Sequence, residues 1–164
     1  MNQIEMLPGE TATHFAARVM AMLKDEDPEK VIQKVMEMMR NNGLQFPTIS
    51  VVLNDLMEER KKSVEVVAGF AGIEPSTLYR IKNRQRNATR NNILRIAMAL
   101  ELSFEETQIL LKSGNCAQLS ASRKRDLFIM QAIVNKNYDI TALNKTLDSQ
   151  KSDGKKMPNL NGRG

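Results

Sequence analysis

The feature that most constrains the fold is the spacing of small and apolar residues between positions 64 and 81. Ala68 is small where two short helices would cross closely, and Gly72 follows four residues later, where a tight turn favours a positive φ angle. Apolar residues occupy the positions that would fix the angle between the helices, namely Val67, Ala71, Ile73, Leu78 and Ile81. This spacing predicts a helix-turn-helix arrangement.

Helical periodicity extends over nearly the whole chain, without strand-like alternation. Local signals support the helix starts: Asp27 precedes Pro28 as an N-cap, and Ser103 with Glu106 forms a capping box. The predicted helices cover roughly residues 11–24, 28–40, 49–61, 64–71, 75–83, 90–100, 103–114, 122–136 and 140–148. We therefore predict an all-α fold.

The predicted helices divide the chain into four segments. Residues 1–46 form a helical hairpin, 47–114 a five-helix domain, 115–148 a two-helix extension, and 149–164 a disordered basic tail. Seven of the 11 Met residues lie within the first 39 positions. Because Met adapts to many partners, the hairpin is interpreted either as a dimerisation or partner-docking module or as a unit whose Met residues pack its own core.

The positive charge is concentrated in mid-chain. The sequence has 24 Lys and Arg against 19 Asp and Glu, a formal net charge of +5. Residues 74–95 contain six basic residues, five of them Arg, against Glu74 alone. Because the planar Arg side chain suits phosphate and guanine, this stretch indicates an anionic partner. A second basic group, Arg123 to Arg125, either contacts phosphate or is simply solvated.

Several function classes lack the residues they need. A single Cys (Cys116) and a single His (His14) exclude a disulfide framework within the chain and leave too few ligands for a zinc or other transition-metal site. The sequence has no Gly-rich phosphate loop and no nucleophile with a suitable His partner. We expect no enzyme activity, no cofactor and no metal. With neither a signal peptide nor a membrane span in the sequence, we expect a cytoplasmic protein.

Residues 48–114 resemble the lambda-repressor-like, Xre/Cro-type DNA-binding domain of bacterial or phage transcription regulators. The resemblance is carried by residues 63–68, 72–81, 83–87 and 93–100. Residues 115–148 are similar to a two-helix extension found in some bacterial members. The resemblance implies a five-helix domain whose third helix, at 75–83, lies in the major groove of DNA.

The resemblance also assigns roles to individual positions. The base-facing residues it implies are Pro75, Ser76, Thr77, Tyr79 and Arg80. The phosphate-facing residues it implies are Ser63, Lys82, Asn83, Arg84, Arg86 and Arg90. Arg80 could donate to O6 and N7 of guanine, whereas Tyr79 either packs on the DNA or covers the domain surface. Leu78 and Ile81 would point into the core.

Three positions in this region carry unusual residues. Val64 stands where the family often has a phosphate-binding Gln, and Pro75 stands at the first, usually polar, base-reading position. Specificity would therefore depend more on Arg80 and on DNA shape. Gly69 lies inside a predicted helix, where it costs about 1 kcal/mol relative to Ala and would allow a neighbour to approach closely.

The function expected from these observations is a sequence-specific double-stranded DNA-binding regulator, a repressor acting as a homodimer at the nucleoid. One alternative is an antitoxin or adaptor that keeps the helix-turn-helix fold and holds a protein partner through residues 1–46. Another is RNA or non-specific nucleic-acid binding. Affinity that is uniform across sequences and falls steeply with salt would indicate the last of these.

Overall fold

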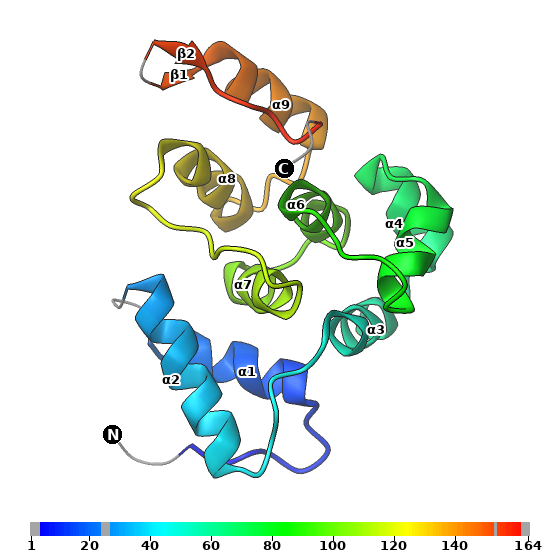
Figure 1. The fold of residues 1–164 in the computed structure, drawn as a ribbon, viewed down its shortest axis with the longest axis vertical. Helices are drawn as coiled ribbons and strands as arrows, with labels where there is room; N and C mark the ends of the chain where they lie inside the picture. Colours follow the sequence, from blue (N-terminus) through cyan, green and yellow to red (C-terminus); the bar gives the residue numbers. More distant parts are fainter. Residues whose placement is uncertain (1–3, 24–26, 153, 162–164) are drawn as a thin grey trace.

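The protein is all-α apart from one short two-stranded hairpin in the computed structural model, which describes residues 4–23, 27–152 and 154–161 (Figure 1). The helices are α1 Ala12–Ala21, α2 Pro28–Asn41, α3 Ile49–Glu59, α4 Val64–Ala71, α5 Pro75–Lys82, α6 Arg90–Ala99, α7 Phe104–Ser113, α8 Lys124–Val134 and α9 Ile140–Ser149. Strands β1 Lys151–Ser152 and β2 Lys155–Lys156 pair antiparallel. The predicted all-α class is confirmed, and each predicted helix is present within a few residues of its expected ends.

The local signals in the sequence determine where these helices begin. The Asp27 carboxylate accepts a hydrogen bond from the Glu29 backbone N–H, and Pro28 is the first residue of α2. At α7, Ser103 and Glu106 form both reciprocal bonds of a capping box. Such caps satisfy N–H groups that the first helical turn leaves without partners.

The N-terminal hairpin of α1 and α2 packs on the rest of the chain instead of forming a separate unit. Helix α1 contacts α7 and α3 as well as α2 (Figure 1). Phe15 and Met39 are buried in one core that continues through the remaining helices. The Thr13 hydroxyl donates to Asp55 Oδ2 on α3 over 2.7 Å, which adds a polar link across the contact. The buried Met residues of the hairpin therefore pack into a core shared with the other helices, whereas its dimerisation or partner-docking role stays a prediction.

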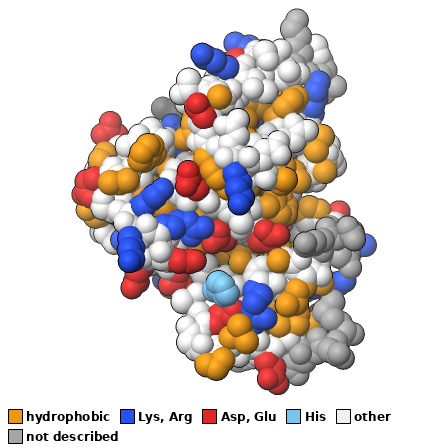
Figure 2. Space-filling model, turned by 180° about the vertical axis from the view of Figure 1, so that it is seen from behind, with side chains coloured by type: hydrophobic (Ala, Val, Ile, Leu, Met, Phe, Trp, Pro, Cys, Tyr) orange, Lys and Arg blue, Asp and Glu red, His pale blue; other side chains and the backbone are white. Residues whose placement is uncertain are grey.

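A charged cluster joins α1 to the segment before it. Arg18 donates from Nε and Nη2 to the two oxygens of Glu10, each over 2.9 Å, and His14 Nδ1 also contacts this carboxylate. The Arg18 bonds, followed by weaker contributions from Leu7 N–H and His14, lower the pKa of Glu10 to about 2. The Glu10 side chain is only 3% exposed. His14 remains at the surface, on a face where acidic and basic side chains are intermixed (Figure 2).

The prediction of a disordered tail at 149–164 is wrong for the described part of that segment. After the β1–β2 hairpin, Met157 and Leu160 are almost completely buried. Arg125 on α8 donates to the carbonyls of Pro158 and Asn159, and Leu160 N–H donates to the Asn144 side chain on α9. One apolar pair with specific hydrogen bonds is sufficient to hold a segment whose average composition is polar. Residues 153 and 162–164 lie outside the described residues.

The described residues include neither a membrane-spanning helix nor a group of metal ligands. None of their helices has the length and apolar character needed to cross a membrane. Within the same ranges, no group of His, Cys, Asp and Glu side chains is arranged to hold a metal ion. Burial raises the pKa of the Cys116 thiol, which keeps it in its weakly reactive neutral form.

Candidate nucleic-acid interface

Helices α4 and α5 meet at the tight turn that the sequence predicts. Gly72 has a φ of 68°, in the left-handed region, and its N–H donates to the Ala68 carbonyl. The Ile73 N–H donates to the same carbonyl over 3.0 Å. Ala68 is fully buried under the crossing, as are Leu78 and Ile81 on the inner side of α5. The predicted core positions of the motif are confirmed.

Arg95 on α6 stabilises this turn by a hydrogen bond to its backbone. Its Nη1 donates to the Gly72 carbonyl over 3.2 Å, and its Nη2 donates to the Asn92 side chain over 2.7 Å. Burial lowers the pKa of the Arg95 guanidinium. Arg95 belongs to the basic stretch counted in the sequence, but its role in the structure is to hold the turn in place.

The outer side of α5 carries the residues predicted to face bases. Pro75 is the first residue of the helix, where its missing N–H removes no hydrogen bond. Pro75, Ser76 and Arg80 are exposed, and Thr77 is half-buried. No side chain among the described residues caps the N-terminus of α5. Pro75 has no N–H, and the Thr77 and Leu78 N–H groups donate to the Glu74 carbonyl, so the first turn offers the Ser76 N–H to DNA. Arg80 stands one turn further along.

Tyr79 has a partner that the sequence analysis did not identify. Its hydroxyl donates to Glu65 Oε1 on α4 over 2.7 Å. This hydrogen bond lowers the pKa of Glu65 and raises that of Tyr79. Both side chains are exposed, so the bond fixes the direction of the Tyr79 ring while leaving the ring accessible. The spacing of 14 residues across a turn offers no periodic signal that could reveal the pair.

The loop after α5 carries the exposed part of the basic stretch. Asn83, Arg84 and Arg86 are exposed, and Lys82 is half-buried. Arg84 and Arg86 line a hollow of about 500 Å³ together with Lys112 at the end of α7. Lys112 adds a positive charge beside the loop that the linear sequence does not place there. Ser63 is exposed, but its hydroxyl already accepts a hydrogen bond from Val66 N–H as the N-cap of α4.

Arg90 lies in a different environment from Arg84 and Arg86. Its Nη1 and Nη2 donate to the two carboxylate oxygens of Asp126, over 3.0 and 2.9 Å. Its Nε and Nη2 also donate to the carbonyls of Ala117 and Gln118. These hydrogen bonds give Arg90 a structural role in anchoring the loop before α8. The phosphate contact expected from the sequence stays a prediction, and it would require the Arg90 side chain to leave Asp126.

The basic group at the start of α8 is also engaged within the chain. Arg123 donates to the Gln118 carbonyl and to Asp126. Arg125 holds the C-terminal segment and donates to the Asn91 side chain over 2.7 Å. Neither residue is simply solvated, because both guanidinium groups donate hydrogen bonds within the chain.

Comparison with known families addresses the same region. A family model for the Cro/C1-type HTH DNA-binding domain matches residues 52–107, from within α3 to within α7. This segment is a lambda-repressor-like helix-turn-helix domain. The Xre/Cro-type resemblance of residues 48–114 is thus confirmed over 52–107, with α1, α2, α8 and α9 outside the match. No curated protein and no solved structure matches the chain.

Proposed function

We propose that the protein is a non-enzymatic, sequence-specific regulator that binds double-stranded DNA with α5 in the major groove. One observation carries the proposal: within the matched Cro/C1-type domain, the outer side of α5 exposes Ser76 and Arg80 while Leu78 and Ile81 anchor its inner side. In helix-turn-helix proteins, the first residues of the second helix contact base edges. Arg80 is the side chain best suited to a bidentate contact with guanine.

The flanking charges support the same orientation. The last residue of α5 and the loop after it would contact the DNA backbone, which fixes register without carrying sequence information, through Lys82, Asn83, Arg84 and Arg86. Ser63 is proposed to contribute through its exposed position at the start of α4. Pro75 and Thr77 would shape the contact at the first bases. Tyr79, whose hydroxyl is held by Glu65, would present its ring to sugar or a thymine methyl group.

We propose further that the regulator acts as a homodimer and as a repressor, at the nucleoid in the cytoplasm. Helix-turn-helix dimers bind two half-sites about one helical turn apart, so a two-fold binding site is expected. The adaptor alternative is less well supported, because the buried face of the hairpin is used inside this chain. A mass measurement in solution, with and without the bound duplex, tests the dimer.

The experiment that tests DNA binding is selection from a random duplex library, followed by affinity measurements on the enriched sequence. Arg80→Ala should weaken binding to that sequence by about 5–150-fold, corresponding to about 1–3 kcal/mol for one bidentate contact. Its affinity for unrelated duplexes should change far less. Arg40→Ala is the matched control, since Arg40 is an exposed Arg at the end of α2.

Two results would overturn the proposal. The first is a library from which no sequence is enriched. The second is an Arg80→Ala protein that binds the enriched sequence as tightly as the Arg40→Ala control does. Equal losses for all duplexes would instead identify Arg80 as a backbone contact and remove it from base recognition.

A further inference from the structure

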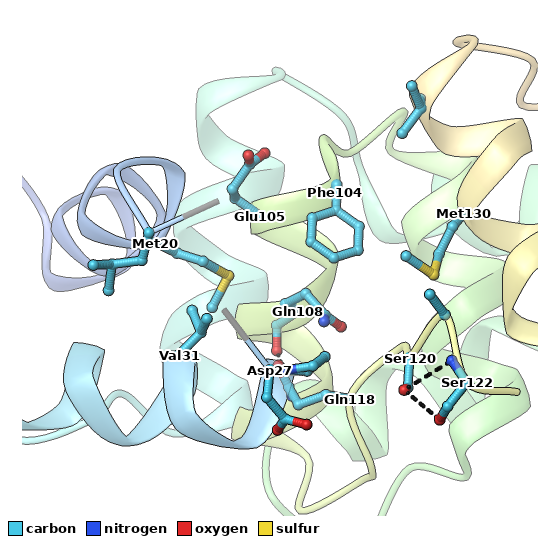
Figure 3. Close-up of a pocket in the computed structure, with 14 residues that line it drawn as sticks. Met20, Asp27, Val31, Phe104, Glu105, Gln108, Gln118, Ser120, Ser122 and Met130 are labelled. Atoms are coloured by element: carbon cyan, nitrogen blue, oxygen red, sulfur yellow. Dashed lines mark hydrogen bonds between the residues drawn. The ribbon is translucent and has the colours of Figure 1, made fainter. Parts of the chain in front are cut away.

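Two hollows at opposite ends of α7 differ in the charge of their walls. The first is a cavity of about 490 Å³ between the start of α7, the N-terminal hairpin and α8, with Gln118 and Met130 in its lining (Figure 3). The charged residues that line it, among those described, are both acidic, namely Asp27 and Glu105. Negative walls disfavour an anion. The second hollow, at the C-terminal end of α7, has the opposite charge.

This second hollow, which we call the basic hollow, has a volume of about 500 Å³. Its charged lining residues are Arg84 and Arg86 from the loop after α5 and Lys112 from the last turn of α7. No acidic side chain of the described residues lines it. A hollow whose charges are all positive concentrates anions from the solution.

The three cations are not neutralised within the protein. No hydrogen bond or ion pair joins the side chains of Arg84, Arg86 or Lys112 to another described residue. Arg95, from the same basic stretch of the sequence, is by contrast bonded to the turn at Gly72. An anion between the three cations would therefore gain their attraction without displacing an existing partner.

Backbone contacts hold both walls of the basic hollow in place. The Arg84 N–H donates to the Ile81 carbonyl over 3.1 Å, so the loop with its two arginines continues directly from the end of α5. On the other wall, Gly114 packs so closely on α6 that an added Cβ would lie 2.5 Å from Ile93 Cδ1. This contact keeps the end of α7, with Lys112, next to the helix-turn-helix region.

We propose that the basic hollow binds the sugar–phosphate backbone of the duplex whose bases contact α5, and that Lys112 is a phosphate contact. A polyanion is the occupant, because Arg84 and Arg86 belong both to the hollow and to the surface proposed to follow the DNA backbone. Such contacts fix the position of the duplex without carrying sequence information. Lys112 lies beyond the matched residues 52–107, so the DNA-binding surface extends past them. The inference rests on the proposed DNA binding.

The test compares Lys112→Gln with Lys30→Gln, since Lys30 is exposed on α2 and does not line the hollow. Affinities for the enriched duplex and for an unrelated duplex are measured at several salt concentrations. Lys112→Gln should weaken binding to both duplexes by about fivefold to tenfold near 0.1 M salt. Its slope of log affinity against log salt concentration should become less steep by about 1. Lys30→Gln should change neither quantity.

A second pair of variants adds a negative charge while keeping the shape of the side chain. Asn115 is exposed, lines the basic hollow and has a φ of 57°, a conformation that Asp tolerates as Asn does. Asn115→Asp should weaken binding to both duplexes. The control is Asn135→Asp, because Asn135 is exposed at the C-terminus of α8 and does not line the hollow. This control should bind as the unmodified protein does.

Each outcome decides the inference. Weaker binding to both duplexes in Lys112→Gln and Asn115→Asp, with unchanged controls, supports it. An unchanged salt slope in Lys112→Gln would overturn it, while selection of one sequence would leave the proposed DNA binding standing. A lower urea midpoint with that unchanged slope would reduce the role of Lys112 to stabilising the end of α7. Failure of the unmodified protein to bind any duplex would overturn the inference and the proposed function together.

Discussion

Arg90→Met is expected to lower the stability of the protein while leaving its contacts with DNA phosphates intact. Arg90 lies in the same basic stretch as Arg86, but its guanidinium donates to both oxygens of Asp126 and to two loop carbonyls. Methionine keeps much of the length and apolar stem of the side chain while removing every one of these donors. The substitution therefore separates an internal role from a DNA-binding one.

The size of the effect follows from what remains around Asp126. Its side chain is 2% exposed, and the remaining hydrogen bonds that the structure describes come from Ser120 N–H at 3.0 Å and Arg123 Nη1 at 3.3 Å. Removing one partner of a buried ion pair costs about 3–5 kcal/mol. Since Arg90 is itself 18% exposed, we expect a value near the lower limit, about 3 kcal/mol. For a chain of this length, that corresponds to a fall in Tm of about 6–12 °C.

Arg86→Met is the matched comparison, because Arg86 is exposed in the loop after α5. Urea unfolding followed by circular dichroism should give a free energy of unfolding within about 0.5 kcal/mol of the unmodified protein. Its affinity for a random-sequence duplex should fall. The slope of log affinity against log salt concentration should become less steep by about 1, as expected for the loss of one phosphate contact. Arg90→Met should instead lose stability in urea and keep both its affinity for the duplex and its salt slope.

Unfolding of Arg90→Met at the same urea concentration as the unmodified protein would contradict the expected loss of stability and would mean that the bonds to Asp126 contribute nothing measurable. A salt slope reduced as in Arg86→Met would mean that the Arg90 side chain leaves Asp126 and contacts the DNA backbone.

Four other substitutions test local features by the same unfolding assay. Gly69→Ala should stabilise α4 by up to about 1 kcal/mol, since an added Cβ would meet no described atom within 4 Å. Gly72→Ala should destabilise the protein by about 1 kcal/mol, because the φ of Gly72 is +68°. Equal effects of the two substitutions would contradict both predictions. Gly114→Ala should cost about 1–3 kcal/mol, because its Cβ would lie 2.5 Å from Ile93 Cδ1; an unchanged midpoint would show that Ile93 moves freely. Glu10→Gln should remove about 2 kcal/mol of stability at neutral pH. This contribution is complete above the ordinary Glu pKa of 4.5 and is lost as the pH falls toward 2, so the two proteins should converge in acid, and a constant difference would refute the lowered pKa.

The sequence predicted those features that depend on neighbouring residues. Caps such as Asp27 and Ser103, and the turn at Gly72, act within one or two helical turns, and the helices begin where these signals place them. The inward and outward positions of α5 were predicted for the same reason, because Leu78 and Arg80 follow a helical periodicity that can be recognised from the sequence alone.

Features that depend on distant residues were missed. The partner of Arg90 lies 36 residues away, and a positive charge in a basic run gives no sign that it is already paired. The close approach expected at Gly69 is absent among the described residues, because its position in α4 faces outward. The cavity beside Gln118 likewise needs three separate segments to form its walls.

The contacts of the C-terminal segment have a consequence for the order in which the protein folds. The Asn91 side chain on α6 donates to the Asn159 carbonyl across a sequence separation of 68 residues, and the next residue, Leu160, is fully buried. During synthesis, α6 therefore leaves the ribosome long before the residues that cover it. We expect the helix-turn-helix region to form early from local contacts, whereas the final packing around α6 waits for residues 157–160.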